Sequence, residues 1–238
     1  MITRGDLEVF FSGLEIRLQG AAEYRAKSAR LIGTDFSIFR FIDYESQFSA
    51  ILADLLDPAG THGQGSIFLS KFLDLIGKRA VVSPVGVLAP LRETVTSRRI
   101  SVRREQPTHN GRFIDIVVGE GDLGLGIENK PWAGDQDRQL RDYATYLSRC
   151  YRGGWILLYI SGAGNLPATY SLSSSERTRL LNAGNYLELS YAADLAEWLD
   201  ACVHACDADK VRWFLRDFQD FAMTKFKMAQ SGGERLDD

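Results

Sequence analysis

Apolar residues recur at intervals of three and four along much of the chain, which is the spacing of one face of an α-helix. Leu7, Phe10, Leu14 and Leu18 form the first such stripe. The pattern predicts helices over residues 6–32, 43–56, 66–77, 135–150, 174–182, 192–206 and 208–229. Asp43 is the expected N-cap of the second helix, and Pro58 lies just beyond its end.

Shorter apolar runs between the helices have the character of β-strands. They lie near residues 94–105, 112–119, 123–130, 155–160 and 186–190. The turn at 119–122 joins two of them as a hairpin, and the helix at 135–150 provides a right-handed crossover to a parallel strand. The order of elements predicts an α/β fold of mixed α+β character, with a central mixed sheet of four to five strands flanked by helices.

Three charged residues interrupt the two strands of this hairpin, although strand interiors usually avoid Asp, Glu and Lys. Asp115 stands between apolar neighbours in the first strand, and Glu128 and Lys130 end the second. Because side chains alternate across a strand, Glu128 and Lys130 share a face. If the hairpin pairs in register, Asp115 lies beside them on that face, so the sequence predicts a functional site here.

Two carboxylates beside one ammonium group form a site for a hard divalent cation. Mg²⁺ prefers oxygen ligands and is commonly held by one or two carboxylates together with substrate phosphate. A nearby lysine can orient or deprotonate a bound water, and it can stabilise the negative charge of a phosphoryl transition state. The hairpin therefore predicts a Mg²⁺ site at Asp115 and Glu128, with Lys130 beside it.

This constellation resembles the PD-(D/E)xK nuclease superfamily, whose pattern is an acid on one strand and acid-x-Lys on the next, followed by a helix. The matching residues are Asp115, Glu128 and Lys130, while Ile114 stands where the motif has its leading Pro. The resemblance covers roughly residues 40–160 and implies a restriction-endonuclease-like core.

Two further matches extend the resemblance beyond the hairpin. Gln139-x-x-x-Tyr143 on the following helix is similar to the Gln-x-x-x-Tyr element of the exonuclease-related branch, and Glu45 fits the expected acid on an upstream helix. The segment from Glu45 through Asp57-Pro58 and His62-Gly63 to Phe68-Leu69 resembles a poorly characterised bacterial branch of the superfamily.

The resemblance implies a role for each of these residues. Asp115 and Glu128 would bind Mg²⁺, for which Mn²⁺ can substitute, helped by the Asn129 carbonyl, and Lys130 would position the attacking water. Glu45 would bind a second cation or its waters, and Gln139 would orient Lys130 or the nucleophile. The expected substrate contacts are Tyr143, Gln136 and His62. Tyr143 could instead support the site, and His62 in its Gly-rich loop is also a candidate hydrogen-bonded brace.

Composition and charge narrow the class of protein. The chain has 238 residues, of which 45% are hydrophobic and 25% charged, an ordinary globular composition. A net charge of -3 does not fit a protein that coats nucleic acid nonspecifically. Basic residues are instead concentrated in two places, as candidate phosphate contacts or as a solvated surface: Arg98, Arg99, Arg103 and Arg104 on one strand, and Arg138, Arg141, Arg149 and Arg152 after the motif.

The sequence starts with no secretory signal pattern and has no apolar run of about 18 residues, so we expect a cytoplasmic protein without a membrane span. Three cysteines do not make a disulfide framework. Cys202, His204 and Cys206 could suggest zinc, but His204 points away from the helical face that the two cysteines share. The cysteines are better interpreted as small buried hydrophobes.

The expected domain organisation is a helical extension over residues 1–40, a nuclease-like core over 41–190, C-terminal helices at 191–230 packed on the same domain, and a disordered tail at 231–238.

The expected function is a metal-dependent nuclease that hydrolyses DNA, with RNA as another candidate. The alternatives are a catalytically silent nucleic-acid-binding or scaffolding module, and a structural protein with an internal ion-pair network. The terminal helices are the expected surface for a homodimer or a partner protein.

Overall fold

The structure is a computed structural model that describes residues 3–32, 37–80, 85–94, 99–132 and 134–231. It divides into two compact units, Met1–Ile38 and Phe39–Asp238. The first unit contains helix α1, Arg4–Ile32, which begins two residues before the predicted start. Arg98 and residues 232–238 of the predicted tail lie outside the described residues.

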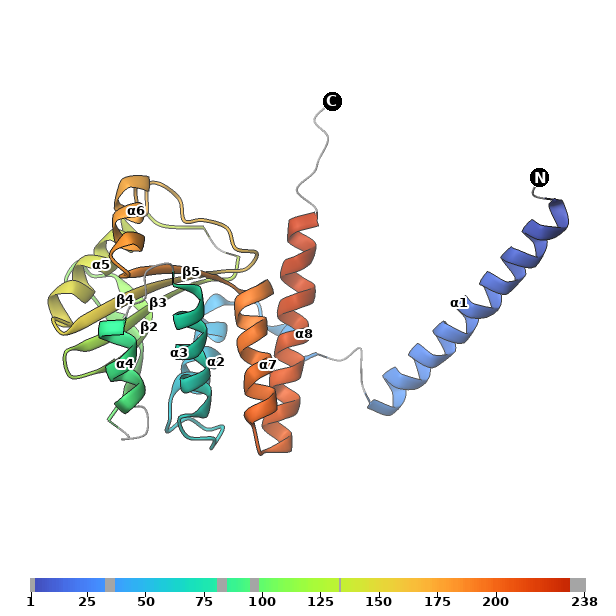
Figure 1. Ribbon diagram of the computed structural model, residues 1–238, viewed down its shortest axis with the longest axis horizontal. Helices are drawn as coiled ribbons and strands as arrows, with labels where there is room; N and C mark the ends of the chain where they lie inside the picture. Colours follow the sequence, from blue (N-terminus) through green and yellow to red (C-terminus); the bar gives the residue numbers. More distant parts are fainter. Residues whose placement is uncertain (1–2, 33–36, 81–84, 95–98, 133, 232–238) are drawn as a thin grey trace, which may run out of the picture. The chain divides into compact units, whose positions relative to one another are not determined.

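The second unit is built on a five-stranded sheet with the order β1-β2-β3-β4-β5 (Figure 1). Its strands are β1 Ser101–Pro107, β2 Phe113–Glu120, β3 Leu123–Lys130, β4 Gly154–Ser161 and β5 Tyr186–Ser190. The first three strands pair antiparallel, and the last two continue the sheet in parallel. The predicted mixed sheet, the hairpin and the parallel crossover strand are therefore confirmed.

Helices cover both faces of this sheet. One face of the sheet is covered by α2, α3, α4 and the C-terminal pair α7 and α8. The other face is covered by α5 and α6. Their bounds are α2 Glu45–Leu56, α3 Ile67–Arg79, α4 Val85–Thr94, α5 Gln139–Cys150, α6 Ser174–Asn182, α7 Ala196–Ala205 and α8 Asp209–Ser231, with a short 3-10 helix at Ile38–Phe41 and a π-helical turn at Tyr191–Leu195.

The structure corrects the prediction of a strand near residues 94–105. Helix α4 ends at Thr94, and β1 begins only at Ser101. Pro90 and two valines give α4 a low intrinsic helix propensity, so its local sequence is not typical of a helix. Leu88 and Leu91 are nevertheless buried in the core, and this packing stabilises the helix.

Two helices also start later than their patterns predict. Helix α2 begins at Glu45 with Tyr44 as its N-cap, so Asp43 does not cap it. Helix α5 begins at Gln139 rather than at residue 135, because tertiary hydrogen bonds hold the preceding turn. The Asp135 carboxylate accepts a bond from the Ala168 N–H at 2.6 Å, and Arg138 adopts a left-handed backbone conformation with φ 56°.

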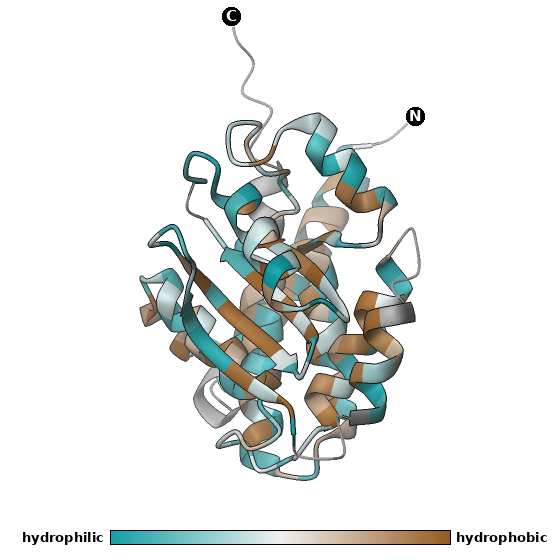
Figure 2. Cartoon of the chain, turned by 90° about the vertical axis from the view of Figure 1, so that its left-hand side faces the viewer, coloured by the Kyte–Doolittle hydropathy of each residue, from teal (hydrophilic) through white to brown (hydrophobic). Residues whose placement is uncertain are grey.

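The core consists of two apolar clusters separated by the sheet. Ile116, Val118 and Ile127 join the larger cluster, whereas Val117 joins the smaller cluster beneath α5. Figure 2 shows hydrophobic segments, in brown, along the strands of the sheet and on the helices around it. Cys202 and Cys206 are buried in the larger cluster, which confirms their interpretation as small hydrophobes, whereas Cys150 is exposed.

Glycines in β3 allow α5 to lie close to the sheet. A Cβ atom added at Gly126 would come within 2.7 Å of the Leu147 side chain, and one at Gly124 would overlap the Tyr151 ring. Any larger residue at these positions would push α5 outward. The two glycines therefore set the height at which α5 holds Gln139 and Tyr143 over the end of β3.

Candidate active site

The end of the β2–β3 hairpin brings the two predicted carboxylates together. Strands β2 and β3 pair as far as Ile116 and Ile127, and one further step in that register would place Asp115 opposite Glu128. The strands separate at this point, and the Asn129 backbone N–H donates to Asp115 Oδ2 at 2.8 Å instead. Asp115 is thus held beside the last residues of β3 by a bond to the backbone.

Glu128 is the most buried member of the site, with 0% of its surface exposed. Its Oε1 atom accepts bonds from the Lys130 ammonium at 2.9 Å and from Gln139 Nε2 at 2.7 Å. Its Oε2 atom is also buried and has no hydrogen-bond partner. Buried polar atoms are nearly always satisfied, so this oxygen is the open position of the site, where it can bind a cation or share a proton with Asp115.

The charges of the site perturb one another. Burial, reinforced by the neighbouring Asp115 carboxylate, raises the pKa of Glu128 to about 8, although the Lys130 ammonium opposes the shift. Burial also raises the pKa of Asp115, against the lowering effect of the Asn129 N–H. Burial alone would lower the pKa of Lys130, but the Glu128, Asp115 and Glu45 carboxylates together outweigh it and the net shift is upward. Without a cation, the two carboxylates therefore retain a proton more readily than isolated acids do.

Gln139 and Tyr143 hold this arrangement from the first turns of α5. The Gln139 amide that donates to Glu128 also donates to the Tyr143 hydroxyl at 3.2 Å. That hydroxyl in turn donates to the Phe113 carbonyl in β2 at 2.5 Å. The two side chains of the predicted Gln-x-x-x-Tyr element thus connect α5 to both strands that carry the acids, and Gln139 contacts Glu128 rather than Lys130.

Asn129 points to the opposite face of the sheet. Its side-chain amide donates to Ser49 Oγ at 3.1 Å and accepts from the Tyr191 hydroxyl at 2.7 Å. These bonds tie β3 to α2 and to the π-helical turn. Only the backbone carbonyl of Asn129, which is the group that the resemblance implies, remains as a candidate ligand.

Glu45 lies at the start of α2 and approaches the site from the other side of the hairpin. Its Oε1 atom accepts a bond from the Trp132 N–H at 3.3 Å, and its charge contributes to the raised pKa of Asp115. The side chain is half-buried. The tertiary fold therefore places Glu45 near Asp115, although the two residues are far apart in the sequence.

The predicted substrate contacts have different surroundings. Both ring nitrogens of His62 are engaged within its own loop, Nε2 with the Asp57 carbonyl at 3.0 Å and Nδ1 with the Gln64 N–H at 3.0 Å. The ring packs on Phe68, so these contacts match the loop brace that the sequence left open. Gln136 is exposed, and its side chain accepts a bond from Arg112 at 3.1 Å.

Two residues that the sequence analysis did not single out also shape the site. Arg112 bonds to Asp142 at 2.8 Å and to the Asp137 carbonyl at 2.6 Å, and so fixes the start of β2 to α5. The charge of Asp135 contributes to the raised pKa of Glu128, and its Oδ1 atom is buried without a partner. The only sequence signal for Asp135 is its position in the polar segment between the acid-x-Lys motif and Gln139.

The donor set fits a hard cation at one position of the fold. In the part of the chain that the structure describes, no three His, Cys, Asp or Glu side chains form a complete metal cluster. Mg²⁺ needs only one or two carboxylates when substrate phosphate and water complete its shell. Asp115 and Glu128, with the unpartnered Oε2 atom between buried groups, meet that requirement.

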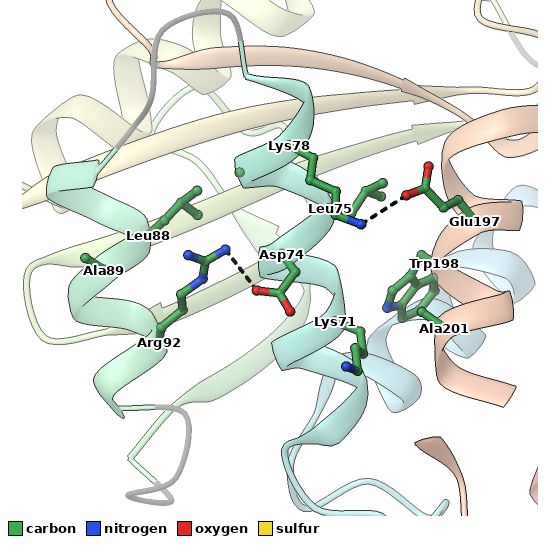
Figure 3. A pocket seen from close by; sticks show the side chains of 11 residues that line it. Lys71, Asp74, Leu75, Lys78, Leu88, Ala89, Arg92, Glu197, Trp198 and Ala201 are labelled. Carbon is green, nitrogen blue, oxygen red and sulfur yellow. Dashed lines mark hydrogen bonds and ion pairs between the residues drawn. The ribbon is translucent and has the colours of Figure 1, made fainter. Parts of the chain in front are cut away.

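A separate pocket of about 490 Å³ lies between α3, α4 and α7 (Figure 3). None of the predicted site residues lines it. Figure 3 shows two ion pairs in it, Arg92 with Asp74 at 3.0 Å and Lys78 with Glu197 at 3.3 Å, and a further lysine, Lys71. Both carboxylates that line this pocket are therefore paired with cations, unlike the Oε2 atom of Glu128.

Comparison with known proteins agrees with this geometry. The family model for the PD-(D/E)XK nuclease superfamily matches residues 36–220, and the chain belongs to this superfamily. The fold is accordingly of the α/β restriction-endonuclease-like type. No curated protein and no solved structure matched the chain. Within the described residues, no helix is both long and apolar enough to cross a membrane.

Proposed function

We propose that the protein is a metal-dependent nuclease that hydrolyses phosphodiester bonds of DNA. The observation that carries the proposal is the buried, unpartnered Oε2 atom of Glu128, which lies beside Asp115 while Lys130 and Gln139 occupy the other carboxylate oxygen. Membership of a nuclease superfamily supports the same activity. Asp115, Glu128 and the Asn129 carbonyl would hold Mg²⁺, and Mn²⁺ would substitute.

When bound, the cation would supply Lewis-acid polarisation of a phosphate oxygen and neutralise its charge. Lys130 would orient the attacking water and donate to the phosphoryl oxygens as negative charge develops. The ammonium is suited to this because its side chain is only 10% exposed and is held at 2.9 Å from Glu128. It therefore needs little reorganisation when substrate arrives.

The other residues would act around this centre. Glu45 would bind a second cation or its waters, which its effect on the pKa of Asp115 supports. Gln139 and Tyr143 would be positioning residues, because they hold Glu128 and the Phe113 carbonyl in place. Arg103 and Arg104, both exposed on β1, would contact the DNA backbone, which gives affinity without reading sequence.

The proposal is tested by incubating the protein with single-stranded DNA, duplex DNA and RNA in Mg²⁺, in Mn²⁺ and in EDTA. Lys130→Ala should lose cleavage. Lys78→Ala is the matched control, since Lys78 also forms an ion pair with a glutamate but lines the remote pocket. Loss of cleavage in both variants would argue against a specific role for Lys130.

The alternative is a catalytically silent nucleic-acid-binding or scaffolding module of the same fold. The presence of Asp115, Glu128 and Lys130 together favours the active enzyme, because a silent module has no need to keep two buried, mutually repelling carboxylates side by side. Binding of nucleic acid without cleavage under any divalent cation would favour the module instead.

We further propose that α1 mediates a homodimer. Among the described residues of its own unit, α1 has no second helix or strand to pack against. It nevertheless carries exposed Leu7, Phe10, Phe11 and Leu14. Light scattering after gel filtration should show a dimer that Leu14→Glu converts to a monomer. A monomeric wild type would contradict the homodimer, and the exposed residues of α1 would then contact a different partner protein or none.

A further inference from the structure

Exposed aromatic side chains gather around the candidate active site. In the described part of the second unit, the exposed aromatic residues are Phe41, Tyr44, Phe113, Trp132, Tyr170 and Trp213. Four of them neighbour the site. Tyr44 precedes Glu45, Phe113 lies two residues before Asp115, Trp132 lies two residues after Lys130, and the Tyr170 hydroxyl donates to the Asp135 carbonyl at 3.2 Å.

Single exposed apolar residues are normal on a protein surface and need no explanation. This group differs because it is aromatic and because it surrounds a buried acidic centre. Phe113 is 56% exposed and begins β2, about 7 Å along the strand from Asp115, at the end of the sheet where β3 ends in Lys130. An exposed aromatic ring next to the proposed phosphate site offers a flat apolar surface to the chemical group that is attached to the phosphate.

Trp132 is held ready for such a contact. Its ring meets Phe48 edge-on at 5.2 Å between centroids and stacks on Phe226 at 6.1 Å, yet 43% of the residue stays exposed. Its backbone N–H is bonded to Glu45. A ring fixed on two sides has lost most of its rotamer freedom before a ligand binds, so stacking on its open side costs little further entropy.

We infer that Phe113 and Trp132 form a stacking platform for unpaired bases, so that the preferred substrate of the site is single-stranded nucleic acid or a frayed end. This inference rests on the proposed nuclease function and specifies its substrate class. Every base has an aromatic face, so stacking contacts of this kind tolerate any sequence. In a duplex the base faces are covered by their neighbours, so the platform has nothing to stack on unless the bases are exposed.

The test measures binding in the Lys130→Ala background with Mg²⁺, so that the probe is not consumed. The probes are a fluorescein-labelled 12-nucleotide oligothymidylate and a blunt duplex of the same length, followed by fluorescence anisotropy. The single strand should bind more tightly than the duplex. Phe113→Leu and Trp132→Leu keep apolar volume but remove the flat ring, and each should weaken single-strand binding by roughly tenfold or more.

Matched variants distinguish the loss of a flat aromatic face from the loss of side-chain volume. Phe113→Tyr and Trp132→Phe should restore single-strand binding, because they restore an aromatic face. Trp213→Leu should leave it unchanged, since Trp213 is 61% exposed but lies about 20 Å along α8 from Phe226, the neighbour of Trp132. Phe113→Leu is the deciding variant if Trp132→Leu fails to fold, because the Phe113 side chain makes no ring contact among the described residues.

Equal or tighter binding of the duplex by the parent, or unchanged single-strand binding by Phe113→Leu, would overturn the inference. Cleavage of the same probes by the wild type is scored separately. Ring-dependent binding without cleavage would leave the platform standing and refute the nuclease proposal. Cleavage by the wild type, together with single-strand binding that neither Phe113→Leu nor Trp132→Leu weakens, would refute the platform but not the nuclease proposal.

Discussion

Glu128 and Gln139 are joined by a 2.7 Å hydrogen bond between a buried carboxylate oxygen and a side-chain amide. The bond links the end of β3 to the first residue of α5. It fixes the rotation of the carboxylate, because Oε1 is shared by Gln139 and Lys130 while Oε2 is left without a partner. The orientation of the proposed ligand atom is therefore set by a residue that would never touch the cation.

Gln139→Ala should accordingly weaken Mg²⁺ binding while the fold survives. Residues that orient a ligand from behind typically change metal affinity by about 10–100-fold. Isothermal titration with Mg²⁺ measures the effect. Gln136→Ala, which removes an exposed amide three residues earlier, serves as the control and should leave the affinity unchanged.

Asp115→Ala should abolish metal binding and cleavage. The metal-free protein should be as stable as the wild type or more stable, because the change removes one of two buried, mutually repelling carboxylates. Calorimetry with Mn²⁺ and thermal melting in EDTA measure the two effects. Asp74→Ala, which removes an acid paired with Arg92 in the remote pocket, should bind metal normally. Normal metal binding by Asp115→Ala would remove the residue from the site.

Lys130→Ala should separate catalysis from metal binding. Cation affinity should stay the same or increase, since a competing positive charge has been removed. The cleavage rate should fall about 100-fold or more, which is the usual cost of losing one transition-state charge contact. Single-turnover cleavage at saturating Mg²⁺ measures the rate, and a rate within a few-fold of the wild type would contradict the role.

The raised pKa of Glu128 predicts a pH dependence in the absence of metal. The ordinary value is 4.5 and the folded value is about 8, so the folded state binds more protons than the unfolded state between these limits. The contribution of Glu128 to the free energy of unfolding is therefore fully present below about 4.5, falls as the pH rises, and is lost near 8. The raised pKa of Asp115 acts in the same direction.

Metal binding should carry the same signature, because the cation displaces the retained proton. Mg²⁺ affinity should increase with pH up to about 8, with proton release detectable by titration in buffers of different ionisation enthalpy. Glu128→Gln should flatten the pH dependence of thermal stability in EDTA. A slope unaltered by this change would assign the dependence to other groups.

Glu45→Gln decides between a site residue and a helix-terminal carboxylate. As a ligand of a second cation or its waters, Glu45 should slow cleavage and alter the Mg²⁺ dependence when changed, with little effect on stability in EDTA. As a first-turn acid, it should leave turnover unchanged and cost about 0.3–1 kcal/mol of stability. Asp43→Asn, two residues earlier and exposed, is the matched control for each measurement.

The sequence by itself determined the hairpin and its acids. Asp115, Glu128 and Lys130 could be placed together because period-two alternation and a short turn are local rules, and the observed pairing of β2 with β3 obeys them. Local rules also predicted most helices and the parallel crossover. They failed at α4, where Pro90 and valines conceal a helix that only core packing stabilises.

The tertiary structure decided which groups surround the acids. Glu45 reaches the site, Gln139 bonds to Glu128, and the Asn129 side chain turns to Ser49 and Tyr191 on the far face. Both ring nitrogens of His62 form hydrogen bonds within its own loop. These outcomes depend on which side chains meet after distant segments pack. Burial and hydrogen-bond partners are properties of that packing, and no spacing along the chain encodes them.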